Sequence, residues 1–229
     1  MDEDHCKTDM VAKAMISTHE LDIDDKYGFV LTRLKRSLDN FGRGNPTEFG
    51  QLITDIFTEC LDVDIMLTAA SSLRCYGFDM TVTLMDLRKA YPYDGDIYKV
   101  VLSGHDVKHL VKRFLRDEVL DEWNDAFFHT SKDLKIIYDR DTGELDISFK
   151  GEPVADDAQY TVGIQEFYYA NARHLLDLSS QQLEKLGGRE TICKDPFGLL
   201  KDYFETHKGL GGRIDDRIII KGGKKEADQ

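Results

Sequence analysis

The chain has 229 residues, 41% of them hydrophobic and 32% charged, so it can bury a sizeable core and we expect one large globular domain. Its formal net charge of -13 argues against general nucleic-acid binding, which needs an excess of Lys and Arg on the contact face. No long apolar run occurs, the start MDEDHCKTD does not resemble a secretory leader, and the four cysteines lie far apart without CxxC spacing. We therefore expect a cytoplasmic protein with reduced thiols and no membrane contact, unless the chain is a fragment of a secreted precursor.

The N-terminal part of the chain is predicted to lie outside the main domain. Residues 1–23 are polar and carry no clear start signal for a helix. Over residues 24–40, apolar side chains recur near helical spacing, at Phe29, Val30, Leu34 and Leu38. This spacing predicts an amphipathic linker helix ahead of the globular part.

Residues 41–220 read as a single α/β domain. Thr47 can cap a helix with one apolar face, formed by Phe49, Leu52, Ile53, Ile56 and Phe57. The later patterns predict, in order, a strand over 64–68, a helix over 86–91, a strand over 97–103, a helix over 105–116, a hairpin of 134–138 with 145–150, a strand over 160–164, a helix from residue 181 and a helix over 195–207. Strands and helices do not alternate strictly, so we expect a mixed sheet with flanking helices (an α+β type) rather than a doubly wound parallel sheet. Residues 221–229 are predicted to be a disordered tail.

Two arginines stand where a ligand could meet them. Arg43 lies among glycines in FGRGNP, and Arg74 follows a predicted strand at the end where open α/β sheets usually bind ligands. Both suit a carboxylate, a phosphate or a polar ring edge, although each could equally pair with one of the many acids.

Aromatic residues gather near the predicted ends of elements. Such rings can stack on a nucleobase or a sugar, or can belong to the core. They are Tyr91, Tyr93, Phe167, Tyr168 and Tyr169.

We find no candidate catalytic, metal or cofactor site in the chain. His105 and His109 share the i, i+4 spacing of some zinc ligands, but no glutamate of an HExxH motif and no third ligand stands nearby, so a solvated helix face is favoured. No GxSxG motif and no convincing Cys/His pair supplies a nucleophile.

Five motifs, read in order, resemble the C-terminal domain of the 5'-nucleotidase and UDP-sugar hydrolase family. They cover about residues 40–220, and their order makes the resemblance fairly specific. They are TEFGQLITDIF, DIMLTAASSLR, TLMDLRKAYPYDGDIYKVVLSGHDV, LKIIYD followed by GEPVADDAQYTVGIQEFYYA, and DDRIII.

The resemblance implies a division of labour between two domains. In that family, an N-terminal metallophosphatase domain holds two metal ions and carries out hydrolysis, and the C-terminal domain binds the nucleoside part of the substrate. The metal-ligand motifs of the first domain are absent from these 229 residues. The chain is thus expected to bind a nucleotide or nucleoside-like ligand, with a divalent metal pair supplied by an N-terminal domain in cis.

Carried over by motif, the resemblance assigns five substrate-binding positions. Arg43 and Arg74 match two arginines that contact the substrate, and Tyr93 and Phe167 match two aromatic residues that stack on either face of the base. The fifth position, Arg173, stands where the family has an acidic contact.

Two departures from the family pattern bear on the ligand. The loop asparagine of the NGGxR motif falls on Ala69, and the acidic contact of the GGDG stretch has become Arg173. Losing an acceptor and gaining a cation should change ligand preference. The alternative reading is a non-catalytic interaction or dimerisation module whose pocket has diverged.

Overall fold

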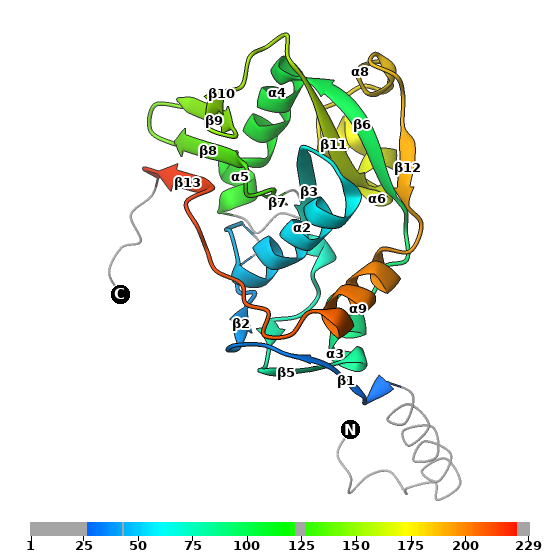
Figure 1. Ribbon diagram of the computed structural model, residues 1–229. Coiled ribbons are helices and arrows are strands. Elements are labelled where there is room, and N and C mark those ends of the chain that lie inside the picture. The colour runs from blue at the N-terminus through cyan, green and yellow to red at the C-terminus, as the bar shows by residue number, and fades with distance from the viewer. Residues whose placement is uncertain (1–26, 43, 122–126, 224–229) are drawn as a thin grey trace, which may run out of the picture.

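A mixed five-stranded sheet lies at the centre of the protein. The computed structural model describes residues 27–42, 44–121 and 127–223 (Figure 1). In the central sheet, in the order β12-β6-β11-β3-β7, β11 runs parallel to β3 and the other neighbours pair antiparallel. Its strands are β3 (Ile65–Ala69), β6 (Ile97–Ser103), β7 (Phe128–Thr130), β11 (Gln159–Gln165) and β12 (Glu190–Cys193).

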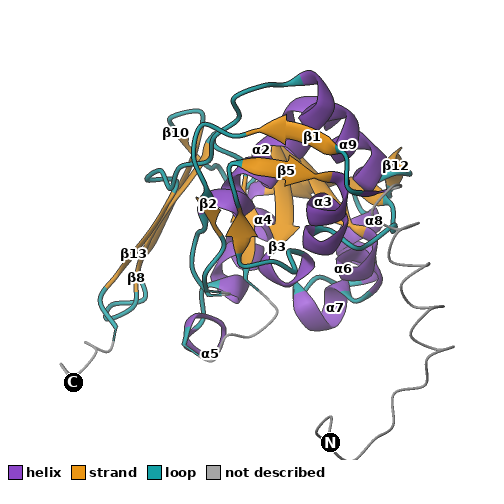
Figure 2. Ribbon diagram, turned by 90° about the horizontal axis from the view of Figure 1, so that it is seen from below, coloured by secondary structure: helices purple, strands orange, loops and turns teal. Residues whose placement is uncertain are grey.

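Three smaller sheets complete the β structure of the described residues. A four-stranded sheet, in the order β10-β9-β8-β13, lies at one side of the molecule (Figure 2). Two short ribbons pair β1 with β5 and β2 with β4. The strands are β8 (Leu134–Asp139), β9 (Leu145–Phe149), β10 (Glu152–Pro153), β13 (Ile218–Lys221), β1 (Val30–Arg33), β2 (Leu38–Asp39), β4 (Gly77–Phe78) and β5 (Thr81–Thr83).

Helices cover both faces of the central sheet. They are α2 (Glu48–Leu61), α3 (Leu84–Ala90), α4 (Gly104–Phe114), α5 (Asp117–Leu120), α6 (Glu166–Ala170), α7 (Ala172–Leu175), α8 (Ser180–Glu184) and α9 (Pro196–Thr206), with a 3-10 turn η1 (Ala70–Ser72) after β3. None of the helices in the described part of the chain is long and apolar enough to cross a membrane.

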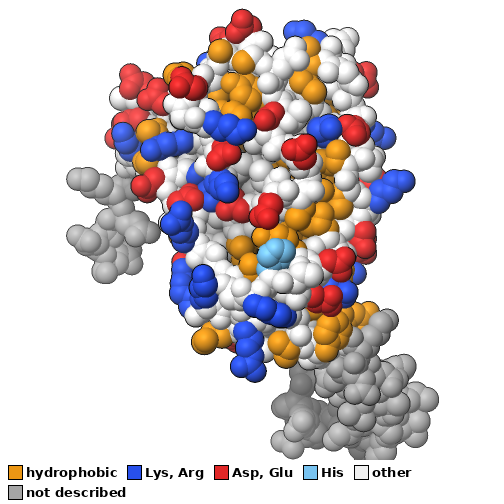
Figure 3. Space-filling view, in the orientation of Figure 1, with side chains coloured by type: hydrophobic (Ala, Val, Ile, Leu, Met, Phe, Trp, Pro, Cys, Tyr) orange, Lys and Arg blue, Asp and Glu red, His pale blue; other side chains and the backbone are white. Residues whose placement is uncertain are grey.

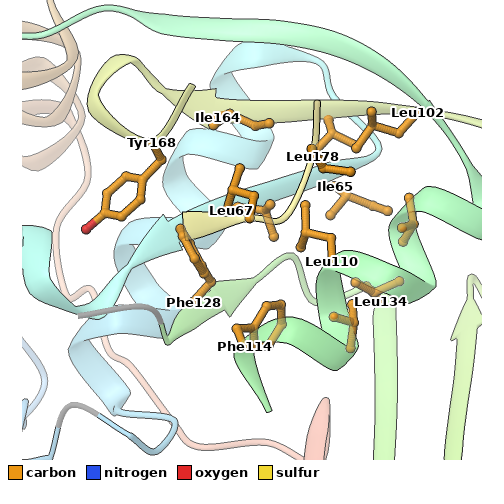
Figure 4. Close-up of a cluster of buried hydrophobic side chains, with 14 of the residues drawn as sticks. Ile65, Leu67, Leu102, Leu110, Phe114, Phe128, Leu134, Ile164, Tyr168 and Leu178 are labelled. Carbon is orange, nitrogen blue, oxygen red and sulfur yellow. The ribbon is translucent and has the colours of Figure 1, made fainter. Parts of the chain in front are cut away.

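The sheet separates two apolar cores, because successive side chains of a strand point to opposite faces. In β3, Ile65 and Leu67 join the core that includes α4, whereas Met66 joins the core under α2, α3 and α9. The first core is packed with aromatic and aliphatic side chains, and Tyr168 lies at its edge with its hydroxyl directed away (Figure 4).

Local signals explain the helix that packs across the second core. The Thr47 side chain accepts a hydrogen bond from the Gly50 backbone N–H, which caps the start of α2. Asp62 ends it in the left-handed conformation, with a φ of 49°. Phe49 and Ile53 on its apolar face are fully buried, as the spacing predicts.

The surface in Figure 3 carries charges of both signs. Acidic and basic side chains are interspersed over much of this face, with Lys and Arg more frequent toward its lower left. The excess of Asp and Glu in the sequence is therefore not concentrated on the face shown in Figure 3.

The mixed α/β architecture confirms the fold class, and the predicted helix at Thr47 and the predicted strands 64–68 and 97–103 are present to within one residue. The helix over 24–40 is wrong in its described part, where Val30–Arg33 and Leu38–Asp39 are strands. Their apolar residues happen to repeat near helical spacing, but pairing with β5 and β4 satisfies the backbone instead.

The ends of the chain are only partly covered by the structure. The polar segment 1–23 and residues 224–229 of the predicted tail lie outside the described residues. The predicted disordered tail starts at Lys221, but Lys221 is the last residue of β13. Two residues farther along, the Gly223 backbone N–H donates to Asp141 Oδ1 at 3.0 Å.

A buried histidine fills the space between α2 and β7. His129 is 1% exposed, and neither ring nitrogen has a hydrogen-bond partner within the described ranges. Its ring packs edge to face against Phe127, and a Cβ on Gly50 would lie 2.1 Å from its Nε2. Only glycine fits at position 50 while this ring is in place. Burial, and then the positive charge of Arg217, lower the pKa of His129 to about 3.

This histidine should make the fold sensitive to acid. In the unfolded chain its pKa is about 6.5, so the unfolded state binds a proton between pH 6.5 and about 3 while the folded state does not. Above pH 6.5, His129 is neutral in both states and does not make the free energy of unfolding depend on pH. Below pH 6.5, His129 lowers that free energy by about 1.4 kcal/mol per pH unit, down to about pH 3. Urea unfolding of the wild type and of His129→Leu at pH 7, 6, 5 and 4 should show this slope in the difference between them.

The exposed His105 offers a matched control. His105→Leu should leave the wild-type slope in place. A wild-type minus His129→Leu difference that stays constant from pH 7 to pH 4 would contradict the assignment.

Candidate functional site

A cavity of about 660 Å³ opens at one edge of the central sheet. The parallel strands β3 and β11 both end there, and the antiparallel β6 begins there. Carboxyl ends of parallel strands are common places for ligand sites. The cavity is lined by Ser71, Ser72, Arg74, Tyr91, Tyr93, Asp94, Gly95, Gln165, Glu166, Phe167, Tyr168, Ala170, Asn171 and Leu175.

Two partly exposed aromatic rings form walls of this cavity. Tyr93 is 40% exposed and Phe167 is 64% exposed, although both are large apolar rings. Each is supported by a buried neighbour in an edge-to-face contact: Tyr91 lies 6.3 Å from Tyr93, and Tyr168 lies 5.2 Å from Phe167, between ring centroids. Exposed aromatic surface in a concave site is typical of a binding site for a flat ligand.

Arg74 is fixed at the mouth of the cavity by two segments. Its backbone N–H donates to the Ala90 carbonyl at the end of α3, at 2.8 Å. Its Nε donates to the Tyr93 hydroxyl at 2.7 Å, with the guanidinium carbon 5.8 Å from the Tyr93 ring centroid. No ion pair within the described part of the chain involves Arg74, so its terminal nitrogens are available to a ligand.

The buried side of the cavity is organised by the side-chain amide of Gln165, the last residue of β11. Its Oε1 accepts from the Ala69 backbone N–H and from the Ser72 hydroxyl, both at 3.1 Å. Its Nε2 donates to the Tyr91 hydroxyl at 3.0 Å. Gln165 therefore joins the ends of β3, β11 and α3.

Two carboxylates stand on the rim of the cavity. Asp94 accepts from Arg88 at 2.7 Å, and Glu166 accepts from the Tyr98 hydroxyl at 3.0 Å. With Arg74, they give the lining one positive and two negative side chains. A ligand that carries both hydrogen-bond donors and an anionic group would meet partners for each.

The cavity brings together three of the five predicted site residues. Arg74, Tyr93 and Phe167 all line the cavity, whereas Arg43 lies outside the described residues. Arg173 is exposed on α7 and is not among the lining residues. Ala69, which has no polar side chain, contributes only its backbone N–H, to Gln165.

Sequence reasoning missed Gln165 and Ser72 and left Tyr91 ambiguous between core and site. Tyr91 proves to be both, since it is 1% exposed and still lines the cavity. The one available signal for Gln165 was a polar residue that follows the apolar Val162 and Ile164 at the end of the strand.

Comparison with known proteins identifies this domain type. A family model described as "5'-nucleotidase, C-terminal domain" matches residues 26–175, which include every cavity-lining residue. A search of curated protein sequences found no match to the chain.

Several solved structures share the fold. The 5'-nucleotidase precursor of Thermus thermophilus has a TM-score of 0.77 at 16% identity, over 93% of this chain and 43% of that one. The NAD nucleotidase of Haemophilus influenzae has 0.71 at 14% identity, over 96% and 42%. The sulfate thiohydrolase of Thermus thermophilus has 0.67 at 13% identity, over 99% and 41%. The chain thus spans less than half the length of the proteins it matches.

Gln165 should be a principal stabilising residue of this edge of the sheet. Gln165→Leu leaves the buried Ala69 N–H and the Ser72 hydroxyl without an acceptor, so we expect a loss of about 2–4 kcal/mol in the free energy of unfolding, measured in urea. Gln165→Glu keeps an acceptor for both groups and should lose less than half as much. Equal stability of Gln165→Leu and the wild type would contradict this role.

Proposed function

The chain belongs to the 5'-nucleotidase C-terminal domain family, and from this premise we propose that its cavity binds the nucleoside part of a nucleotide substrate. Hydrolysis of that substrate would be carried out by a metallophosphatase domain in cis, outside these 229 residues. The observation that carries the proposal is the convergence of Tyr93, Phe167 and Arg74 on one cavity. Each of the three was predicted as a substrate contact from the sequence.

The two exposed rings supply the main attraction for a base. Stacking on an aromatic side chain contributes about 1–3 kcal/mol per base in nucleic-acid complexes. Tyr93 and Phe167 come from different parts of the chain, one after α3 and one at the start of α6. In this proposal they contact opposite faces of one base.

Arg74 supplies a positive charge for the polar part of the ligand. Because Nε is held by Tyr93, the guanidinium is oriented before the ligand arrives. Its remaining N–H groups can donate to ribose hydroxyls or to a phosphate.

The chemistry of hydrolysis would fall to the missing partner. A divalent metal pair held by that N-terminal domain would supply an activated water and would stabilise charge on the phosphate. This chain would bind and orient the nucleoside part and would contribute no catalytic group.

A second candidate is a non-catalytic interaction module that keeps the fold without the ligand. The observation that favours it is Ala69, which presents no polar side chain to a ligand. Ligand binding separates the two candidates.

Phe167→Ala should weaken binding with little effect on folding. Removing one stacking wall should lower the affinity for adenosine or AMP by about 10- to 100-fold, whereas a side chain that is 64% exposed adds little to stability. NMR titration of the folded chain with adenosine, AMP and a UDP-sugar suits the weak affinity expected of one isolated domain.

Tyr76→Ala is the matched control, because Tyr76 is also aromatic, is 81% exposed and does not line the cavity. It should leave every affinity unchanged. A folded wild-type chain that binds none of the three ligands would contradict the proposal and favour the interaction module.

A further inference from the structure

The hydrogen bonds around Gln165 fix the direction of the Tyr91 proton. A backbone N–H can only donate, so the Gln165 atom that meets the Ala69 N–H must be the carbonyl oxygen. The other end of the amide is then the NH₂ group, which donates to the Tyr91 oxygen. Tyr91 therefore accepts from Gln165, and its own proton points elsewhere.

That proton has no acceptor within the described ranges. Gln165 is the one hydrogen-bond partner that the Tyr91 hydroxyl has there, and Tyr91 is 1% exposed while lining the cavity. Burial raises the pKa of Tyr91 to about 12, so the hydroxyl keeps its proton at neutral pH. A buried O–H without an acceptor is costly, and a ligand in the cavity can remove that cost.

Ser72 has the opposite polarity. Its hydroxyl proton is given to Gln165 Oε1, which leaves the Ser72 oxygen with acceptor capacity only. Ser72 and Tyr91 bind the two ends of one amide, so they lie near one another, and both line the cavity. The buried wall thus offers one donor beside one acceptor.

We propose that Tyr91 and Ser72, oriented by Gln165, read the edge of the bound ring and select a nucleobase edge with a hydrogen-bond acceptor next to a donor. The amidine edge of adenine and the lactam edges of hypoxanthine and uracil have this pattern. Tyr91 donates to the ring nitrogen or carbonyl oxygen, and Ser72 accepts from the neighbouring N–H. Gln165 acts as a positioning residue. The inference rests on the proposed binding of a base between Tyr93 and Phe167.

The pattern gives the cavity selectivity that stacking alone cannot supply, since every base has two flat faces. A site built to donate a hydrogen bond discriminates against a ligand without an acceptor, because the buried donor is then left unpaired. A naphthyl C-riboside is such a ligand: it keeps the flat rings and the ribose but has no polar edge.

The experiment compares the dissociation constant of the naphthyl riboside with that of whichever nucleoside binds best among adenosine, inosine and uridine. Both are measured by NMR titration of the full chain, and the readout is their ratio. The wild type should favour the nucleoside by about tenfold or more. Tyr91→Phe keeps the ring and removes the donor, so it should abolish most of that preference while leaving the naphthyl riboside affinity unchanged.

Gln165→Glu tests the positioning role without removing Tyr91. A carboxylate accepts from Ala69, Ser72 and Tyr91, so the Tyr91 proton turns away from the ligand. The preference for the nucleoside should fall as in Tyr91→Phe, in a protein that remains folded.

Three results would overturn the inference. In the first, Tyr91→Phe leaves the ratio unchanged; in the second, it weakens both ligands equally, which would mean that Tyr91 only supports packing. In both, the nucleoside still binds the wild type and the proposed function survives. In the third, the folded wild type binds neither ligand, and the proposed function itself fails.

Discussion

The side-chain amide of Gln165 is the interaction on which the geometry of the candidate site depends. It lies at the end of β11, accepts from the last residue of β3 and from η1, and donates to the residue that follows α3. These three attachments place Tyr91 beneath Tyr93 and set Arg74, two residues beyond Ser72, at the mouth of the cavity. A single buried polar group, satisfied at both ends, thereby converts the edge of a sheet into a site with a defined shape.

Sequence patterns predicted those parts of the fold whose causes are local. The helix after Thr47 has its cap and its apolar stripe within one short segment, and β6 forms from one short segment of mostly apolar residues. The local spacing predicts a helix over Val30–Arg33, but this segment is a strand because it pairs with Thr81–Thr83. No local pattern reveals that pairing. The same reason applies to the site. Arg74, Tyr93 and Phe167 stand next to recognisable motifs. Gln165, in contrast, acts through hydrogen bonds to Ala69 and Tyr91, which are 96 and 74 positions away from it in the sequence.

The fold is shared with proteins whose names indicate different substrates, among them a 5'-nucleotidase, an NAD nucleotidase and a sulfate thiohydrolase. At 13–16% identity, this likeness establishes the architecture and leaves ligand choice to the side chains of each cavity. In this chain those side chains are two exposed rings, one oriented guanidinium and a polar wall arranged by an amide. These side chains are chemically complementary to a flat ligand with a polar edge, more than to a purely apolar or a purely anionic ligand.

If a base lies between Tyr93 and Phe167, intermolecular nuclear Overhauser effects will detect it beside both rings. With adenosine bound to the isotopically labelled chain, the H2 and H8 protons of the base should show contacts to ring protons of both Tyr93 and Phe167. Contacts to neither ring, with the nucleoside bound elsewhere on the domain, would contradict the account.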